Sequence, residues 1–182
     1  MSAERKAGIR ALLKGIESGD PDCVLVVNPE KYIQHNPQTH EGREGLAALF
    51  KRLSETSPRV NVVRIFSDGD FVFGHTEYDF SKSRVGFEVF CFEGDQAVEH
   101  WDNIQPMRGP NPSRRAMLDG ATVIEDLDRT EANRALVREF TVYGSFAGCA
   151  RGLLISILQI PRMLRKRLRL RRIFHRADLD RT

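Results

Sequence analysis

Hydrophobic side chains in the first part of the chain recur with helical spacing. Residues 3–17 carry one apolar face, formed by Ile9, Leu12, Leu13 and Ile16, which is the i, i+3, i+4, i+7 pattern of an amphipathic helix. Residues 43–56 repeat this pattern with Leu46, Leu49, Phe50 and Leu53. Between them, Asn-Pro pairs at 28–29 and 36–37 divide the segment 21–37, which predicts two short helical pieces there.

The hydrophobic period changes to two after residue 58, as expected of β-strands. Four strands are predicted: one that starts at Val60 and contains an irregularity, then 71–80, 85–92 and 97–106. Asp68-Gly69 and Glu93-Gly94-Asp95 have the composition of hairpin turns. Helices followed by a four-stranded antiparallel meander indicate an α+β fold, in which the helices pack on one curved face of the sheet.

Polar side chains stand among large apolar ones at alternate positions of three predicted strands. These sets are Phe71, Phe73, His75 and Glu77; Glu88, Phe90 and Phe92; and Val98, His100, Asp102 and Ile104. Because alternate side chains of a strand point the same way, each set occupies one face of its strand. If the three faces converge, they form a small-molecule pocket with aromatic walls and several titratable groups.

Asp102 is the candidate general base of this pocket. Apolar neighbours would strip its carboxylate of water, which raises the pKa toward a range useful for proton transfer. His75 or His100 would donate a hydrogen bond or a proton to a developing enolate oxygen, and Glu88 would hold one histidine in its working tautomer. The alternative is that Asp102 only accepts a structural hydrogen bond near the end of its strand.

Further candidate ligand contacts come from the segment before the second long helix and from the strands. They are Tyr32, His35, Asn36, Phe73, Glu77, Glu88, Phe90 and Trp101. Trp101 alternates with Asp102 and so occupies the opposite strand face, where a core or interface position is the alternative. The histidines match no compact metal-ligand spacing, and the sequence has no glycine-rich phosphate loop and no GxSxG motif. We therefore expect neither a metal nor a cofactor.

Composition sets the expected domain count and cellular compartment. With 182 residues, of which 41% are apolar and 29% charged, the chain can form one globular domain with an appendage. Its three cysteines are widely spaced and form no CxxC pair. The N-terminal segment lacks the continuous apolar stretch of a secretory signal. These features predict a cytoplasmic protein.

Charge separates the last part of the chain from the rest. Residues 1–145 contain 18 Lys and Arg against 23 Asp and Glu, whereas residues 146–182 contain 10 against 2. The apolar run 153–160 is far shorter than the ~20 residues of a membrane span. Residues 161–176 interleave basic and apolar side chains, which suits an amphipathic helix on an anionic membrane or a nucleic acid. The alternative is a solvated tail without a partner.

A resemblance to a known family rests on three segments, YIQHNPQTHEGREGL (32–46), GDFVFGHTEY (69–78) and GFEVFCFEGDQAVEHWDNIQP (86–106). Together they resemble the SnoaL-like group of the nuclear-transport-factor-2-like superfamily over about residues 5–112. The resemblance implies a cone-shaped α+β barrel with a pocket between sheet and helices, and frequent homodimers through the outer sheet face. Polyketide cyclases of this group catalyse an intramolecular aldol condensation without metal or cofactor, and Asp102 matches the position of their aspartate base.

The resemblance also bears on domain organisation. Residues 119–140 look like the link into a second copy of the domain in tandem members of the group, but no second QHNP or EHWD follows residue 145. We therefore expect a pocket domain over 1–112, a linker over 113–129, and a helical, strongly basic extension over 130–182 that is a truncated repeat.

Three functions remain open from the sequence. The first is a cofactor-independent cyclase, lyase or isomerase that performs acid–base chemistry on a small carbonyl compound. The second is a non-catalytic module that binds a small ligand in the same pocket, since a fold by itself does not determine a reaction. The third is an interaction protein that acts through its basic tail.

Overall fold

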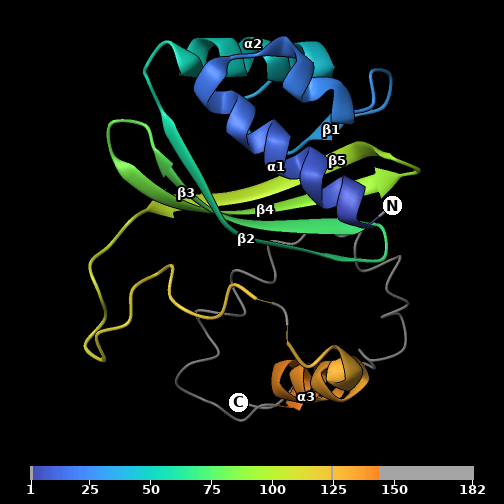
Figure 1. Cartoon of the computed structure of the whole chain (residues 1–182), viewed down its shortest axis with the longest axis vertical. Coiled ribbons are helices and arrows are strands. Elements are labelled where there is room, and N and C mark those ends of the chain that lie inside the picture. The colour runs from blue at the N-terminus through green and yellow to red at the C-terminus, as the bar shows by residue number, and fades with distance from the viewer. Residues whose placement is uncertain (1, 124, 144–182) are drawn as a thin grey trace, which may run out of the picture. The chain divides into compact units, whose positions relative to one another are not determined.

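A computed structural model describes residues 2–123 and 125–143 (Figure 1). The chain divides into two compact units between residues 124 and 125. The elements of the first unit are α1 (Ser2–Ser18), the 3₁₀ helix η1 (Pro21–Val26), β1 (Ile33–Gln34), α2 (Gly42–Ser54), β2 (Arg59–Asp68), β3 (Phe71–Asp79), β4 (Ser83–Glu93) and β5 (Gln96–Pro106). The second unit contains η2 (Leu127–Arg129) and α3 (Thr130–Tyr143).

One five-stranded sheet forms the base of the first unit. Its strand order is β1-β5-β4-β3-β2, with β2 to β5 antiparallel and β1 parallel to β5. The sheet curves beneath α1 and α2, which cover one of its faces (Figure 1). The predicted α+β class, the antiparallel meander and the N-terminal helices are confirmed. The sheet is curved but not closed, and the parallel edge strand β1 makes it mixed.

The irregularity predicted in the first strand is a shift in the pairing of β2 with β3. Val62 pairs with Thr76, whereas Arg64 pairs with His75, so Val63 has no partner of its own. The side-chain alternation of β2 therefore reverses at this point. As a result, both Val62 and Ile65 face the helices, although they are three residues apart.

The segment between the two long helices differs from its prediction. One helical piece is present as η1, but the second is replaced by the short strand β1. The backbone N–H of His35 donates to the carbonyl oxygen of His100 at 3.1 Å, and Ile33 and Gln34 pair with Glu99 and His100. Pairing with the open edge of β5 thus overrides the helical preference read from the isolated segment.

The core lies between the helices and the concave face of the sheet. On α1 it includes Ile9, Leu12, Leu13 and Ile16, which are at most 6% exposed and are the residues predicted from helical periodicity. Val72, Tyr78, Phe90 and Phe92 pack from the sheet side. Full burial of one such side chain contributes about 1.5–3 kcal/mol, so this layer provides most of the stability of the unit.

Several predictions concern the C-terminal part of the chain. The predicted helix after residue 129 is present as α3. The basic stretch 161–176, the apolar run 153–160 and any truncated repeat beyond residue 143 lie outside the described residues, and the predicted domain boundaries stay a prediction. In the part of the chain that the structure describes, no helix is long and apolar enough to cross a membrane.

The close approach of α1 to η1 depends on Gly15. A Cβ at this position would lie 2.2 Å from Sγ and 2.4 Å from Cβ of Cys23, so the helix would have to move. Overpacking costs about 1–3 kcal/mol, and the better helix propensity of alanine offsets about 1 kcal/mol of it. We expect Gly15→Ala to lower the free energy of unfolding, by up to about 2 kcal/mol, in urea denaturation.

Gly109→Ala is the matched control for this prediction, because nothing lies within 4 Å of a Cβ at position 109. It should leave the unfolding midpoint unchanged. Equal stability of the two variants would contradict a packing role for Gly15.

Candidate functional site

A cavity of about 550 Å³ lies between α1, α2 and the concave face of the sheet. Its apolar walls come from both helices and from the strands, and they include Leu12, Leu13, Ile16, Leu46, Leu49, Phe50, Leu53, Phe80, Phe90 and Ile104. Its polar and charged lining residues are Tyr32, Gln34, Asn36, Gln38, Thr39, Arg52, Tyr78, Arg84, Glu88, His100 and Asp102. A mostly apolar cavity with a few convergent polar groups is typical of a small-molecule site.

Strand pairing places the titratable groups side by side. Glu88 of β4 pairs with Asp102 of β5, and Phe90 pairs with His100. Residues directly opposite each other in antiparallel strands share a face of the sheet, so these side chains point into the same cavity. Each of Glu88, His100 and Asp102 offers one oxygen or nitrogen within 4.8 Å of those of the other two.

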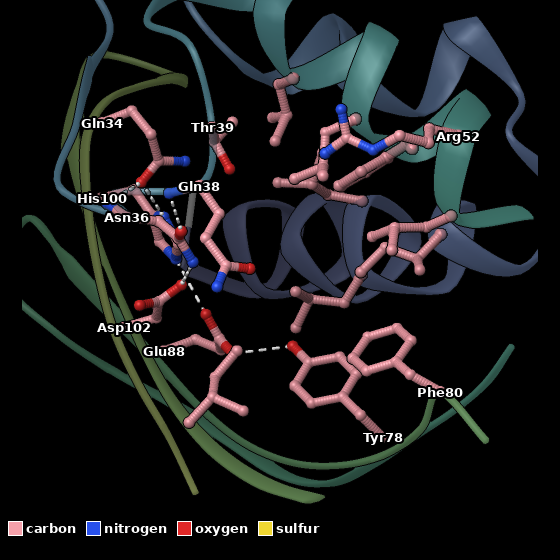
Figure 2. A pocket seen from close by; sticks show the side chains of 18 of the residues that line it. Gln34, Asn36, Gln38, Thr39, Arg52, Tyr78, Phe80, Glu88, His100 and Asp102 are labelled. Carbon is pink, nitrogen blue, oxygen red and sulfur yellow. Dashed lines mark hydrogen bonds and ion pairs between the residues drawn. The ribbon is translucent and has the colours of Figure 1, made fainter. Parts of the chain in front are cut away.

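A chain of hydrogen bonds runs across four neighbouring strands (Figure 2). The Tyr78 hydroxyl donates to Oε1 of Glu88 at 2.7 Å. Oε2 of Glu88 lies 2.8 Å from Nε2 of His100, and Nδ1 of His100 lies 2.9 Å from Oε1 of Gln34. Glu88 is 2% exposed and His100 6%. Both carboxyl oxygens of Glu88 and both ring nitrogens of His100 therefore have hydrogen-bond partners inside the protein.

The backbone determines where the protons of this chain lie. The backbone N–H of Asn36 donates to Oε1 of Gln34 at 3.0 Å, which identifies that atom as the amide oxygen. Since an amide oxygen only accepts, Nδ1 of His100 carries a hydrogen. One further proton is then shared between Nε2 of His100 and Oε2 of Glu88. The pair is neutral overall, whichever of the two atoms carries this proton.

Asp102 differs from this pair because its carboxylate has a single partner among the residues that the structure describes. Nδ2 of Asn36 donates to its Oδ2 at 2.5 Å, and Oδ1 has no bond among the described residues. Burial, and next the charge of Glu88, raise the pKa of Asp102 above its ordinary value, although Asn36 and His100 act in the opposite direction. A partly desolvated carboxylate with one free oxygen suits a general base.

Two residues that line the cavity have a buried hydroxyl group without a hydrogen-bond partner among the described residues. They are Tyr32 and Thr39. Burial, followed by the charges of Glu88 and Asp102, raises the pKa of Tyr32 far above its ordinary value, so this hydroxyl stays protonated. Leaving a buried hydroxyl unpaired costs about 1–3 kcal/mol, which a ligand acceptor in the cavity would offset.

Comparison with known protein families shows which family has this architecture. The SnoaL-like domain family matches residues 9–125. The chain belongs to this family. No match is found among the curated proteins.

Solved structures support the same fold at low sequence identity. An NTF2-like protein of unknown function from Burkholderia xenovorans is 17% identical over 62% of this chain and 91% of its own, with a TM-score of 0.53. TsrD from Streptomyces laurentii is 20% identical over 56% and 88%, with a TM-score of 0.50. A candidate ketosteroid isomerase from Kribbella flavida is 16% identical over 68% and 93%, also with a TM-score of 0.50. At these identities the likeness concerns the fold alone.

Six of the predicted site residues line the cavity of this SnoaL-like domain. They are Tyr32, Asn36, Glu88, Phe90, His100 and Asp102. The predicted convergence of the third and fourth meander strands is confirmed, as is the predicted contact of Glu88 with a histidine. What these residues do in a reaction stays a prediction.

The predicted face of the second meander strand is wrong. Phe73, His75 and Glu77 of β3 are not among the cavity-lining residues, because Gly74 pairs with Glu88 and shares its face. The side chain of His75 stacks on Phe87 at 4.4 Å between ring centroids. His75 therefore lies on the opposite face of the sheet from His100 and cannot assist Asp102.

His75 has a structural environment instead. Nη1 of Arg64 donates to its Nδ1 at 2.7 Å, and Nη2 of Arg64 donates to the carbonyl oxygen of Leu118 at 2.9 Å. Burial and the charge of Arg64 lower the pKa of His75, which keeps the ring neutral. This arrangement attaches the segment after β5 to the outer face of the sheet.

His35 and Trp101 also lie outside the cavity. Their rings stack at 5.1 Å with an interplanar angle of 6°, and Nε2 of His35 lies 2.9 Å from Oε1 of Glu99. Alternation along β1 explains this position, since Tyr32, Gln34 and Asn36 take the inward places. For Trp101, the alternative of a core or interface position agrees with the structure.

The cavity is also lined by residues that were not predicted from the sequence, among them Gln34, Tyr78, Arg52 and Arg84. For Tyr78 a signal exists in the hairpin between β3 and β4. Asp79 pairs with Ser83 across a three-residue loop, so even-numbered residues of β3 oppose even-numbered residues of β4. A two- or four-residue loop would have produced the face that was predicted.

The cluster of Glu88, His100 and Asp102 offers ligand atoms that a metal ion could use. An ion in that position would have to displace the 2.8 Å contact between Glu88 and His100, whose atoms are otherwise engaged by Tyr78 and Gln34. The hydrogen-bonded arrangement therefore fits proton transfer better than metal coordination.

The two cavity tyrosines allow a test of the hydrogen-bond chain. Tyr78→Phe removes the donor to Oε1 of Glu88, and loss of a hydrogen bond to a buried carboxyl group costs about 1–3 kcal/mol. We expect this loss in the free energy of unfolding measured with urea. Tyr32→Phe is the matched control: it removes a hydroxyl without a partner among the described residues, and it should be neutral or stabilising. Equal destabilisation by both changes would contradict the assignment.

Proposed function

We propose that this SnoaL-like protein is a cofactor-independent acid–base catalyst that removes a proton next to a carbonyl group, in an aldol-type cyclisation or a related isomerisation or elimination. The observation that carries the proposal is Asp102, a carboxylate in an apolar cavity with one oxygen free and with its pKa raised by burial. The cavity volume of about 550 Å³ is sufficient for a small aromatic or polycyclic ketone.

The proposed reaction uses side chains of residues that line the cavity. Asp102 accepts a proton from the carbon next to the carbonyl, so the C–H bond breaks and its electron pair forms an enolate. The free hydroxyl of Tyr32 donates a hydrogen bond to the enolate oxygen. In a cyclisation, the enolate carbon attacks a second carbonyl, and the new alkoxide recovers the proton from Asp102.

In this proposal the Glu88–His100 pair acts as a positioning group. Because the pair is neutral as a unit, His100 opposes the repulsion that the charge of Glu88 exerts on Asp102. Such a preorganised polar wall lowers the cost of moving charge between Asp102 and the substrate.

A non-catalytic binding module is the second candidate function. The unpartnered hydroxyls of Tyr32 and Thr39 would serve a bound ligand equally well without any reaction. Catalysis and binding differ in one measurable property, which is proton exchange at the carbon next to the carbonyl.

The test uses 1-phenylbutane-1,3-dione as a probe in D₂O, with exchange of its methylene protons followed by NMR. We expect the protein to accelerate exchange above the buffer rate, and Asp102→Asn to reduce the acceleration by about 100-fold or more while probe affinity changes less than threefold. Because only the carboxylate form is a base, the rate should rise with pH through the raised pKa of Asp102. The asparagine variant should lack this rise.

Asp95→Asn, an exposed change in the β4–β5 turn, is the matched control and should exchange the probe at the parent rate. Binding without acceleration would favour the binding module. Loss of acceleration on treatment with EDTA would indicate the metal use of the cluster.

We also propose that the homodimer implied by the family resemblance forms through the outer sheet face. Phe66 and Phe87 are 44% and 51% exposed there, and Phe66 stacks on Phe73 at 5.0 Å. Exposed aromatic side chains on one sheet face are typical of an association surface.

Light scattering should give twice the monomer mass for the parent protein. The double variant Phe66→Ser, Phe87→Ser should give the mass of the monomer. A monomeric parent at 100 µM would contradict the dimer.

A further inference from the structure

The charged groups that line the cavity are unevenly distributed. The acid–base cluster of Glu88, His100 and Asp102 occupies the sheet wall, whereas Arg52 lies across the cavity on α2 (Figure 2). Arg84 is the second cationic lining residue and precedes Glu88 by four positions on β4, on the same strand face. At ~3.4 Å per residue, the backbone positions of Arg84 and Glu88 are roughly 14 Å apart.

Neither cavity arginine has a hydrogen-bond or ion-pair partner in the part of the chain that the structure describes. Three other arginines of the domain bond within the protein: Arg10 donates to the carbonyl oxygen of Val62 at 3.1 Å, Arg43 donates to that of Val27 at 2.9 Å, and Arg64 donates to His75 at 2.7 Å. Arg52 is exposed and Arg84 half-buried. The cavity therefore presents two guanidinium groups whose donors are available to a ligand.

The wall near these arginines is apolar. Leu49 and Leu53 belong to α2 with Arg52, Phe80 follows β3, and Ile104 continues β5 beyond Asp102. A ligand that reaches from the arginines to Asp102 must therefore pass apolar side chains in its middle part. The cavity thus offers a cationic region, an apolar region and an acid–base region. A single ligand that spans the cavity would place a different part of itself in each region.

We propose that the substrate is a carbonyl compound with an anionic group, a carboxylate, held by Arg52 and Arg84 and separated from the reacting ketone by a flat apolar body. The proposal rests on the acid–base function proposed above and identifies its substrate class. Guanidinium groups bind carboxylates through paired, charge-assisted hydrogen bonds. The same charge is repelled by Asp102, so attraction at one end and repulsion at the other favour one orientation, with the ketone next to the base.

Two probes of nearly equal size test this inference. They are 4-(3-oxobutanoyl)benzoate, which carries a carboxylate across the ring from the 1,3-diketone, and its methyl ester, which is neutral. We expect calorimetric titration of the full chain to show about 10- to 100-fold tighter binding of the acid than of the ester, as expected for charge-assisted hydrogen bonds. The preference should shrink as sodium chloride is raised, because salt screens the charges.

Arg52→Met and Arg84→Met keep an unbranched apolar stem and remove the charged guanidinium group. Each should weaken binding of the acid about tenfold and leave the ester within twofold. Lys51→Met and Lys82→Met are the matched controls, since each removes one positive charge from an exposed neighbouring position that does not line the cavity. Both controls should bind the acid as the parent does.

Equal affinity of the parent for acid and ester, or no binding of the acid, would overturn the proposal. So would equal loss of acid binding in the lysine controls, because the effect would then be due to net charge. Failure here is distinguishable from failure of the proposed function. Asp102-dependent exchange of 1-phenylbutane-1,3-dione, which has no carboxylate, tests the base independently of the arginines.

Discussion

The cavity depends on a one-residue shift in the pairing of β4 with β5. Glu93 pairs with Gln96 next to the turn and Phe92 with Ala97, whereas Cys91 pairs with Glu99, so Val98 is the extra residue of β5. If the register at the turn continued unchanged, Glu88 would lie opposite Trp101 instead of Asp102. The bulge thus reverses the alternation of the remainder of β5. It places the His100 imidazole and the Asp102 carboxyl group on the concave face, beside Glu88 of β4, and the Trp101 indole on the convex one.

Buried ionisable groups are stable here because the chain satisfies them in pairs. An isolated carboxylate in an apolar interior is costly, whereas one that accepts hydrogen bonds at both oxygens is tolerated. Room for this arrangement comes from Gly86, where a Cβ would lie 2.7 Å from Cε2 of Tyr78 and 2.9 Å from Oε1 of Glu88. The absent side chain at position 86 is therefore a condition for the contact between Tyr78 and Glu88.

The sequence predicts the elements of this fold much better than it predicts how they face one another. Helical and strand periods locate α1, α2 and all four meander strands because each period is a local property. The face of a strand depends on loop length and bulges, which a single residue can change. Asp102 was assigned to the cavity and His75 was too, yet only Asp102 is there, because the three-residue loop before β4 reverses the expected relation.

The edge strand β1 could not be predicted for a related reason. Its two residues have no period to detect, and only the open edge of β5 makes them a strand. The amides of Gln34 and Asn36, which contact His100 and Asp102, are placed by this pairing. Arg52 and Arg84 were not predicted as cavity residues, because the sequence does not distinguish a cavity arginine from any other surface arginine. Only the folded chain brings the two residues to one cavity.

The shortness of β1 has a consequence for how this domain can change over time. A two-residue pairing at a sheet edge contributes little to global stability and opens more readily than the central strands. Yet it holds the amides that orient the imidazole and the free carboxylate. Substitutions on its solvent side, as at Ile33, which is 37% exposed, can therefore adjust proton affinity inside the cavity without altering its lining. Substitutions in the edge strand β1 can therefore change the reactivity of the cavity while the fold stays the same.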